Sequence, residues 1–305
     1  MGTPDFAVAS QNALTKTQHD IIAVVTRPDT PKGRGLEITP SPVKAFALAR
    51  GLKILQPDLL GNPSFKEQLL NLSPDLIVIV AFKILPLDIL KVPRLGTINL
   101  HASLLPRYRG AAPIQRAIAA GETTTGLTVF FLGDIVDGGD VIKQLPVPIK
   151  PEETAGELSD RLKVMGADLL AESVNAIAEG KVTPSRQDSG EACPAPKLKK
   201  EEGKIDFTRP AREIYNRIRA FTPAPGAFTL YKGKRVLVVR AAISEESSTG
   251  KPGSVLSVDA KRIRVRAGDG KTVDFLELKP ENKKAMSAND FVNGSRLSEN
   301  DTFSD

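Results

Sequence analysis

The chain has 305 residues, 41% hydrophobic and 26% charged, a composition typical of a globular protein with two domains and not of a disordered or fibrous one. The longest apolar stretch, residues 76–82, is far shorter than the roughly 20 residues of a membrane helix, and the start lacks the continuous apolar core of a signal peptide. Cys193 is the only cysteine, which excludes an intramolecular disulfide and argues against a cysteine metal site. We therefore expect a cytoplasmic enzyme without a metal.

The net charge of +6 is unevenly distributed along the chain. Residues 206–305 carry 18 Lys/Arg against 13 Asp/Glu, whereas residues 1–205 carry 24 against 23. A basic domain beside a neutral one suggests a polyanionic partner, most commonly a nucleic acid, although basic side chains merely solvated on strand faces would give the same count. Glu299, Asp301 and Asp305 fall in a stretch that we expect to be a polar tail.

The first two thirds of the chain alternate helices with strands. Thr3-Pro4-Asp5 predicts a helix start with Thr3 as the N-cap, and this helix is expected to end near Thr17. The spacing of apolar residues predicts strands at 21–26, 76–80, 97–101, 127–131 and 141–147, and helices at 42–50, 112–120 and 154–179. Such alternation indicates a doubly wound (Rossmann-like) α/β domain with its ligand at the carboxyl ends of the strands.

A doubly wound domain normally opens with a strand, yet this chain opens on a predicted helix. Without that strand, its neighbours would lack a ladder partner in the middle of the sheet. Either the start codon has been placed too late or the fold begins atypically; we favour the first explanation.

The pattern changes after a charged stretch at residues 197–204 (KLKKEEGK). A helix predicted at 211–220 precedes short strand-like segments at 227–230, 235–243, 253–258, 262–266 and 271–278. Several short strands separated by turns predict a small OB-like β-barrel, a fold that commonly binds nucleic acids. We therefore divide the chain into a catalytic domain (1–196), a linker (197–204) and a C-terminal OB-like domain (205–305).

One of the two histidines, His101, ends a predicted strand, and Asn99 precedes it by two residues. The period of two places both side chains on one face, at the strand end where α/β enzymes hold their sites. An amide that stabilises an oxyanion beside an imidazole that moves protons suits acyl transfer, although a satisfied polar pair at a strand end explains the spacing equally well. His19, at a helix-to-strand turn, is expected on the surface.

Asp137 lies in the segment 134–140 (DIVDGGD), between two predicted strands. Glycines after an acid allow a backbone to approach a ligand closely, but taken alone the segment is better explained as an ordinary Asp-Gly turn. The sequence contains no P-loop, dinucleotide fingerprint or His/Cys metal cluster. No nucleophilic serine or cysteine arrangement is evident, which favours direct group transfer over a covalent enzyme intermediate.

Residues 99–113 (NLHASLLPRYRGAAP) closely resemble the formyltransferase signature of methionyl-tRNA formyltransferases. Four further stretches are similar to segments of that family: 2–8 (GTPDFAV), 40–44 (PSPVK), 194–198 (PAPKL) and 283–288 (KKAMSA). The resemblance implies transfer of a formyl group from 10-formyltetrahydrofolate to the amino group of initiator methionyl-tRNA. It implies a soluble enzyme without a membrane or metal partner, and we expect a monomer.

The resemblance also implies roles for individual residues. Asn99 and His101 would polarise the formyl group and hold the oxyanion, with His101 moving protons, and Asp137 would orient His101 directly or through water. The implied folate site comprises Ser103, Leu104, Leu105, Pro106, Phe82, Ile84, Ile135, Val136 and Gly138.

Residues 27–35 (RPDTPKGRG) resemble the loop that inserts into the acceptor stem of initiator tRNA in this family. Without the resemblance, they would be interpreted as a surface loop. The implied tRNA contacts are Lys32, Arg34, Arg235, Arg262, Arg264 and Arg266.

Besides the absent first strand, two departures from the family pattern stand out. Leu36-Glu37 replaces two lysines in the insertion loop, which could weaken tRNA binding, and Phe82-Lys83 replaces a Tyr-Gly pair, which could alter the turn beside the folate. Three alternatives stay open: a formyltransferase acting on a small amine (a purine precursor or an amino sugar), a hydrolase releasing formate, and a catalytically dead tRNA-binding module.

Overall fold

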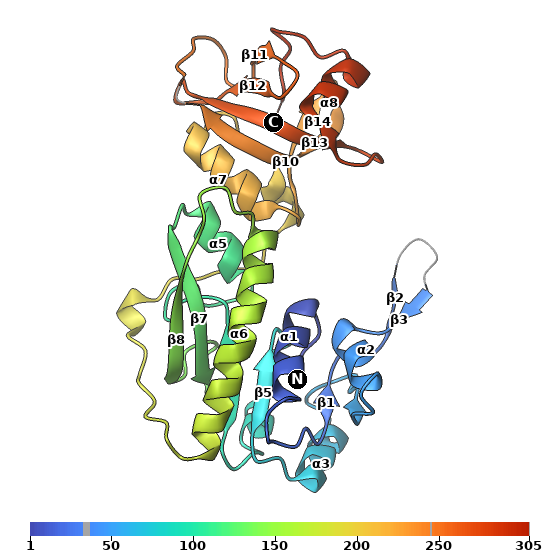
Figure 1. The fold of residues 1–305 in the computed structure, drawn as a ribbon, viewed down its shortest axis with the longest axis vertical. Helices are drawn as coiled ribbons and strands as arrows, with labels where there is room; N and C mark the ends of the chain where they lie inside the picture. Colours follow the sequence, from blue (N-terminus) through green and yellow to red (C-terminus); the bar gives the residue numbers. More distant parts are fainter. Residues whose placement is uncertain (33–36, 245, 305) are drawn as a thin grey trace. The chain divides into compact units, whose positions relative to one another are not determined.

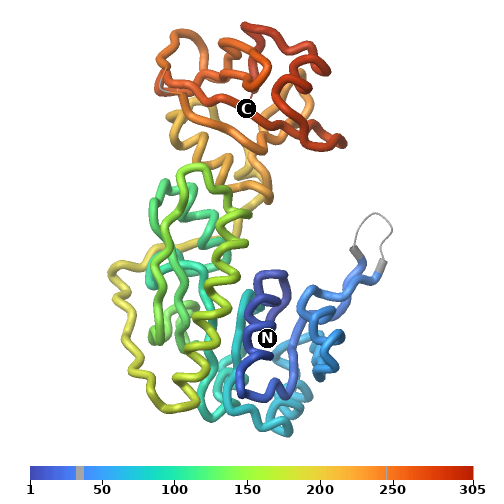
Figure 2. The backbone as a smooth tube through the Cα atoms, viewed as in Figure 1, coloured from blue at the N-terminus to red at the C-terminus, as the bar shows by residue number. Residues whose placement is uncertain are grey.

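The computed structural model describes residues 1–32, 37–244 and 246–304, and Figures 1 and 2 show the path of the chain. Contacts divide the protein into two compact units. The first unit comprises Met1–Ala111, Thr125–Val147 and Ser159–Ala195; the second comprises Ala112–Thr124, Pro148–Leu158 and Pro196–Asp305. The second unit thus takes in two segments that the predicted division at residue 196 assigned to the catalytic domain.

The first unit is a Rossmann-like α/β domain. Its strands are β1 (Val24–Val25), β2 (Thr30–Lys32), β3 (Glu37–Thr39), β4 (Ile54–Leu55), β5 (Ile77–Val80), β6 (Thr97–His101), β7 (Thr124–Phe131) and β8 (Val141–Pro148). Its helices are α1 (Asp5–Leu14), α2 (Pro42–Leu48), α3 (Pro63–Leu72), α4 (Leu87–Leu90), most of α6 (Ala155–Ala178) and the short η1 (Ser189–Glu191). The main sheet has the order β5-β6-β7-β8, with β5 parallel to β6 and β6 antiparallel to β7.

Helices cover both faces of this sheet, as the sequence of β5 requires. Ile77 and Ile79 point into a core with Phe65 and Leu69 of α3. Successive residues of a strand point to opposite faces, so the even-numbered residues of β5 face α1. Helix α6 lies against β6 and β7: a Cβ built on Gly166 would stand only 2.9 Å from the Leu100 side chain. Apolar side chains on both faces explain the continuous β-branched run of β5.

The start of the chain differs from the prediction. Helix α1 begins at Asp5 with Pro4 as its N-cap and no side-chain cap, so the predicted capping role of Thr3 is wrong, and the helix ends at Leu14. Only Val24–Val25 of the predicted strand 21–26 pairs with a neighbour, β4, to which β1 runs parallel. Because β1 and β4 form a sheet of their own, Met1 and Gly2 are the link by backbone hydrogen bonds between that sheet and the main sheet among the described residues.

The second unit combines helices with one antiparallel sheet. Its elements are α5 (Pro113–Ala119), η2 (Lys200–Gly203), α7 (Ala211–Phe221), β9 (Ala227–Tyr231), β10 (Lys234–Ser244), β11 (Val255–Val258), β12 (Ile263–Arg266), β13 (Thr272–Pro280), β14 (Met286–Ser287) and α8 (Ala288–Ser295). The strand order is β11-β12-β13-β10-β9, and β14 pairs with β13. Apolar residues three and four positions apart bury one face of α7 against α5 and β10.

The last residues of the chain lie between the two edges of this sheet. Leu230 of β9 and Ser304 exchange two hydrogen bonds of 3.0 Å, while Phe303 N donates to Gly253 O and Val255 N donates to Asp301 O. The Phe303 side chain is buried among aromatic rings. The strands listed above form an open sheet with β11 and β9 at its edges. The segment 301–304 bonds to both edges, so the arrangement is barrel-like. Of the expected polar tail, Glu299 is exposed and Asp305 lies outside the described residues, whereas Asp301 and Phe303 are held by the sheet.

Candidate active site

Asn99 and His101 both lie on β6, in the interior of the main sheet. Asn99 pairs with Ile79 of β5 and with Phe130 of β7, and His101 pairs with Thr128. His101 is buried with its ring edge-on to Phe130 at 6.5 Å. The Oδ1 atom of Asn99 is buried and has no hydrogen-bond partner among the described residues. A buried amide oxygen without a partner is costly, so this end of the side chain suits a bound ligand.

The loop after β6 fixes the ring of His101. His101 Nε2 lies 2.8 Å from Tyr108 O, and since a carbonyl can only accept, Nε2 must carry the proton. The neutral ring then leaves its lone pair on Nδ1. Tyr108 has a left-handed backbone (φ 60°), and its N–H donates to Cys193 Sγ at 3.2 Å. The loop thus turns back under the histidine and selects its tautomer.

Asp137 approaches the other nitrogen of His101. Its Oδ2 lies 3.9 Å from His101 Nδ1, and both side chains are buried. This separation exceeds a hydrogen bond, so the two side chains are near neighbours without a direct hydrogen bond between them. Asp137 Oδ2 accepts instead from Gly110 N at 2.8 Å. The structure therefore brings Asn99 and His101 onto one strand and Asp137 beside His101.

Gln187, which the sequence did not single out, holds the Asp137 loop. Its Nε2 donates to Asp137 O (3.0 Å) and to Gly139 O (2.7 Å). Its Oε1 accepts from Arg109 Nε (3.1 Å) and Nη2 (2.7 Å), which joins the Asp137 loop to the loop after β6. Asp137 adopts φ 52°, an uncommon conformation for a residue other than glycine. One side chain thus ties together the two loops that surround His101.

The segment predicted to bind folate is also held by side chains outside the motif. Thr128 Oγ1 donates to Ser103 O (2.7 Å) and accepts from Leu105 N (3.1 Å). Gln144 Nε2 donates to Leu105 O at 2.8 Å. Ser103 itself is fully buried and donates to Arg107 O. Ser103 and Leu105 therefore shape the backbone, whereas Leu104 and Pro106 remain half-buried.

Apolar side chains are exposed on the two other segments of the predicted folate site. Ile84, Ile135 and Val136 are 75%, 61% and 52% exposed, and Phe82 is half-buried. Gly138 closes the turn that presents Ile135, because a Cβ there would lie 2.6 Å from that side chain. Exposed apolar groups beside a polar site suit a flat, partly apolar ligand such as a pterin. The left-handed residue of the Phe82-Lys83 turn is Ala81, not Lys83, so lysine replaces glycine there without backbone strain.

The predicted tRNA contacts belong to both units of the chain. Arg34, Leu36 and the side chains of Lys32 and Glu37 lie outside the described part of the structure; the backbone of Lys32 ends β2, which pairs with β3. Arg235 is half-buried, with its guanidinium 3.9 Å from the centre of the Phe228 ring. Arg266 donates to Ser248 O.

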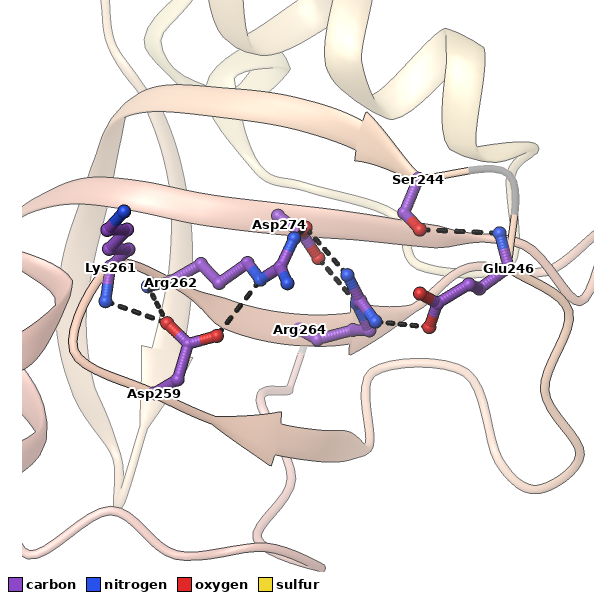
Figure 3. A network of polar contacts seen from close by, with 7 residues as sticks. All are labelled: Ser244, Glu246, Asp259, Lys261, Arg262, Arg264 and Asp274. Carbon is purple, nitrogen blue, oxygen red and sulfur yellow. Dashed lines mark hydrogen bonds and ion pairs between the residues drawn. The ribbon is translucent and has the colours of Figure 1, made fainter.

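Arg262 and Arg264 belong to an ion-pair network on the face of the C-terminal sheet (Figure 3). Arg264 of β12 stands opposite Asp274 of β13 and donates to both of its carboxylate oxygens at 2.9 and 3.1 Å. It also pairs with Glu246, while Arg262 donates to Asp259 and to Asp274. The Arg264 side chain is only 10% exposed. Arg264 is therefore neutralised by acidic partners in this structure, and its contact with tRNA stays a prediction.

No group of three or more His, Cys, Asp or Glu side chains in the described ranges is arranged to hold a metal ion. None of the helices described is long and apolar enough to span a membrane.

Comparison with known proteins finds formyltransferases for both halves of the chain. The family model described as formyl transferase matches residues 1–174, and that of the formyl transferase C-terminal domain matches residues 197–296. Methionyl-tRNA formyltransferases of Acidobacterium capsulatum and Moorella thermoacetica are both 45% identical to the chain, covering 97% and 96% of it and 96% and 94% of their own lengths.

Solved structures with the same fold include two N-formyltransferases. The sugar 3N-formyl transferase WlaRD, solved with dTDP and 5-N-formyl-THF, has a TM-score of 0.69 at 18% identity, covering 93% of this chain and 97% of its own. The N-formyltransferase of Helicobacter canadensis, in complex with folinic acid and dTDP-3-aminofucose, has a TM-score of 0.70 at 18% identity, covering 90% and 96%. At this identity, the likeness establishes the fold alone.

Proposed function

The chain belongs to the methionyl-tRNA formyltransferases, and on that premise we propose that it transfers the formyl group of 10-formyltetrahydrofolate to the free amino group of initiator methionyl-tRNA. The product, N-formylmethionyl-tRNA, serves translation initiation. At the site, the proposal rests on one observation. Asn99 and His101 lie together at a buried strand end, and the Asp137 carboxylate lies 3.9 Å from the imidazole of His101.

We propose that Asn99 and His101 act directly on the reacting groups. The amine nitrogen attacks the formyl carbon, a C–N bond forms, and the carbonyl oxygen becomes an oxyanion that the Asn99 amide stabilises. The bond to the folate nitrogen then breaks, and the proton released by the amine is passed to that nitrogen. His101 is suited to this transfer because Tyr108 O holds its Nε2–H, so Nδ1 is the atom left to accept and return the proton.

Asp137 supports the charged form of His101 in this proposal. A protonated imidazole would carry its positive charge within 4 Å of the carboxylate, in a buried setting where charges attract strongly. Gly110 N and Gln187 hold Asp137 in position. Gln187 is thus proposed as a positioning residue that does not itself contact the reacting atoms.

We propose that folate binds between the loop after β6 and the exposed apolar side chains of the neighbouring loops. Ser103, Leu104, Leu105 and Pro106 would contribute backbone groups and an apolar wall. Phe82, Ile84, Ile135 and Val136 would cover the ring system, and Gly138 would allow its close approach. The unpartnered Oδ1 of Asn99 supports a polar ligand group at this point.

For tRNA, we propose contacts from Lys32 and Arg34 in the insertion loop and from Arg235 in the C-terminal unit. Arg262 and Arg266 could contribute only by leaving their present partners. A monomer acting in the cytoplasm, where translation begins, is the setting that we propose for this activity.

The experiment that tests the function is the transfer of labelled formyl from 10-formyltetrahydrofolate to charged initiator Met-tRNA. His101→Ala should lower the rate by on the order of 10²–10³. His19→Ala is the matched control: His19 is the second histidine, hydrogen-bonded to Asn175 away from the site, and its loss should leave the rate unchanged. Absence of transfer by well-folded wild-type protein would refute the proposed function, and equal rates for both variants would refute the proposed site.

The acceptor is tested separately, because a sugar N-formyltransferase would share the same chemistry. Initiator Met-tRNA and a dTDP-linked amino sugar should be compared at matched concentrations, with formate release measured in the absence of either acceptor. We expect saturation kinetics with the tRNA alone. Transfer to the amino sugar, or formate release without an acceptor, would instead favour the small-amine or hydrolase alternative. Calorimetric binding of folate separates all of these from a catalytically dead module.

A further inference from the structure

Strand β7 shares one of its faces with the candidate catalytic residues. Thr128 pairs with His101 of β6, and Phe130 pairs with Asn99. Residues that stand opposite each other in two paired strands point to the same face of the sheet, so Thr128 and Phe130 lie on the face of His101 and Asn99. Gly126 lies two residues before Thr128 and therefore faces the same way.

The hydroxyl group of Thr128 uses its full hydrogen-bonding capacity around the loop after β6. Its proton is donated to Ser103 O at 2.7 Å. Its oxygen accepts from Leu105 N at 3.1 Å and from Gln144 Nε2 at 3.0 Å. A hydroxyl offers one donor and two acceptor positions, and all three are occupied here. Because Thr128 is also completely buried, its hydroxyl is fixed in one orientation.

Gln144 reaches the same loop from the neighbouring strand β8. Its Nε2 donates to Leu105 O at 2.8 Å as well as to Thr128 Oγ1, which uses both protons of the amide. The reverse orientation of the amide is unfavourable, because it would set two oxygens against each other at Leu105. Thr128 and Gln144 together thus bind the C=O of Ser103 and both backbone groups of Leu105.

Gly126 provides the space for Leu104, which lies between the two residues bound by Thr128. A Cβ built on Gly126 would stand only 2.4 Å from the Leu104 side chain. Leu104 O accepts from Arg107 N at 3.0 Å, and Ser103 Oγ donates to Arg107 O. The stretch 103–107 is therefore held along its length, and side chains of β7 and β8 set its path.

We propose that Thr128 and Gln144 are positioning residues for the folate co-substrate. They hold the backbone of residues 103–105 in the shape that receives the folate, without touching the reacting atoms themselves. This inference rests on the proposed function, in which the same loop forms a wall of the folate site. A wall that is already in place binds its ligand more tightly, because no loop has to be ordered during binding.

The far end of the loop is held by other contacts. Tyr108 O accepts from His101 Nε2, and Tyr108 N donates to Cys193 Sγ. Neither of these bonds involves Thr128 or Gln144. Loosening the folate end of the loop should therefore raise the KM for 10-formyltetrahydrofolate, while kcat, which depends on the imidazole, changes little.

Thr128→Val tests the proposal in the full chain, because valine keeps the shape of threonine and removes the hydroxyl. Thr125→Val on the same strand is the matched control: the Thr125 hydroxyl is also buried, but it has no partner among the described residues. Thr128→Ser restores the hydroxyl. The measurements are steady-state kinetics with varied 10-formyltetrahydrofolate, calorimetric binding of tetrahydrofolate, and amide hydrogen exchange at Leu105 without ligand.

Thr128→Val should raise the KM for 10-formyltetrahydrofolate and the Kd for tetrahydrofolate by roughly 10- to 30-fold, the effect of the two lost bonds to the loop. Exchange at Leu105 should become about tenfold faster, and kcat should stay within about threefold of the parent value. Thr125→Val and Thr128→Ser should resemble the parent. A loss of kcat with unchanged KM would overturn the proposal, because a purely structural defect lowers the fraction of active protein and not the affinity.

Gln144→Met keeps the test decisive if Thr128→Val does not fold, because Gln144 is an exposed residue. Its control is Lys143→Met, which removes the neighbouring side chain, paired with Glu172 at 2.6 Å. Gln144→Met should raise the Kd for tetrahydrofolate by about fivefold, and equal Kd values for the two variants would overturn the proposal.

The binding measurement also separates this inference from the proposed function. If the parent chain binds tetrahydrofolate but transfers no formyl group, the proposed function fails. If the parent and Thr128→Val bind tetrahydrofolate equally well, this inference alone fails. A parent chain that does not bind tetrahydrofolate would overturn both.

Discussion

Replacing Gln187 by alanine tests whether the Asp137 loop must be held for catalysis. The side chain donates two hydrogen bonds, to Asp137 O and Gly139 O, and accepts two from Arg109. At about 1 kcal/mol for each donated bond, the loop loses on the order of 2 kcal/mol of positional stabilisation. If that loss falls on the transition state, kcat drops by roughly 10- to 30-fold. The KM for tRNA should change little, because Gln187 is not among the proposed tRNA contacts.

A second variant separates the two ends of this side chain. Gln187→Glu keeps an acceptor for Arg109 but replaces the donor to the two carbonyls with an oxygen, so it should lose as much activity as Gln187→Ala. Gln56→Ala is the contrasting control, because Gln56 also donates two hydrogen bonds, to Arg27 O and Asp29 Oδ1. Both partners lie in the proposed insertion loop, so its loss should change the KM for tRNA and leave kcat unchanged.

The assay is steady-state formyl transfer with saturating 10-formyltetrahydrofolate and varied initiator Met-tRNA, accompanied by thermal unfolding of each variant. A kcat for Gln187→Ala within about twofold of the parent would refute the reasoning. So would a loss of kcat that is matched by global unfolding at the assay temperature, since the effect is then not confined to the loop.

Three further predictions concern the second unit. Asp274→Asn should lower the free energy of unfolding by about 3 kcal/mol, measured in urea, because Arg264 would stay buried without its main partner; a change below about 1 kcal/mol would contradict this. Phe303→Ala should lower the free energy of unfolding by about 3 kcal/mol in the same measurement, since the ring is buried in the core. A loss as small as that of a surface substitution would contradict the role of Phe303 in joining the two sheet edges. The Arg240 guanidinium and the Thr154 N–H lower the pKa of Glu157 from 4.5 to about 2, so its stabilising contribution is complete above pH 4.5 and is lost as the pH falls towards 2. As the pH is lowered, the urea midpoint of Arg240→Met should therefore fall less steeply than that of the parent chain. Parallel plots of midpoint against pH would refute a stabilising role of the Glu157–Arg240 pair.

The sequence predicts best the helices and strands in which apolar residues recur at regular spacing. The strand at 97–101 and the helix at 154–179 agree with β6 and α6 to within a residue at each end, because both have buried, regularly spaced apolar faces. Helix α3 was not predicted, although Asn62 caps it and Pro63 opens it, a signal that was present. Of the predicted strand at 21–26, only two residues form β1, and its neighbour on the side of β5 consists of Met1 and Gly2 alone.

At the candidate site too, local sequence patterns predicted some features, whereas contacts between distant residues could not be predicted. The period of two was enough to place Asn99 and His101 on one face, but it contains nothing about Gln187, which is 50 residues from Asp137 in sequence. Similarly, the ion pair of Arg264 could not be predicted, because the sequence does not give the strand register that sets this residue opposite Asp274. Contacts between distant segments, not propensities, account for both omissions.

The pairing of Arg262 and Arg264 with acids has a consequence for how the protein would respond to salt. Binding to a polyanion gains free energy when protein cations displace counterions condensed on the phosphates, and each such contact contributes roughly 0.7 to 0.9 to the slope of log K against log salt. An arginine already neutralised by Asp274 displaces none. The slope for tRNA should therefore be shallower than the number of basic residues in the C-terminal unit suggests, and it should report on the loop around Lys32 more than on the face of β12.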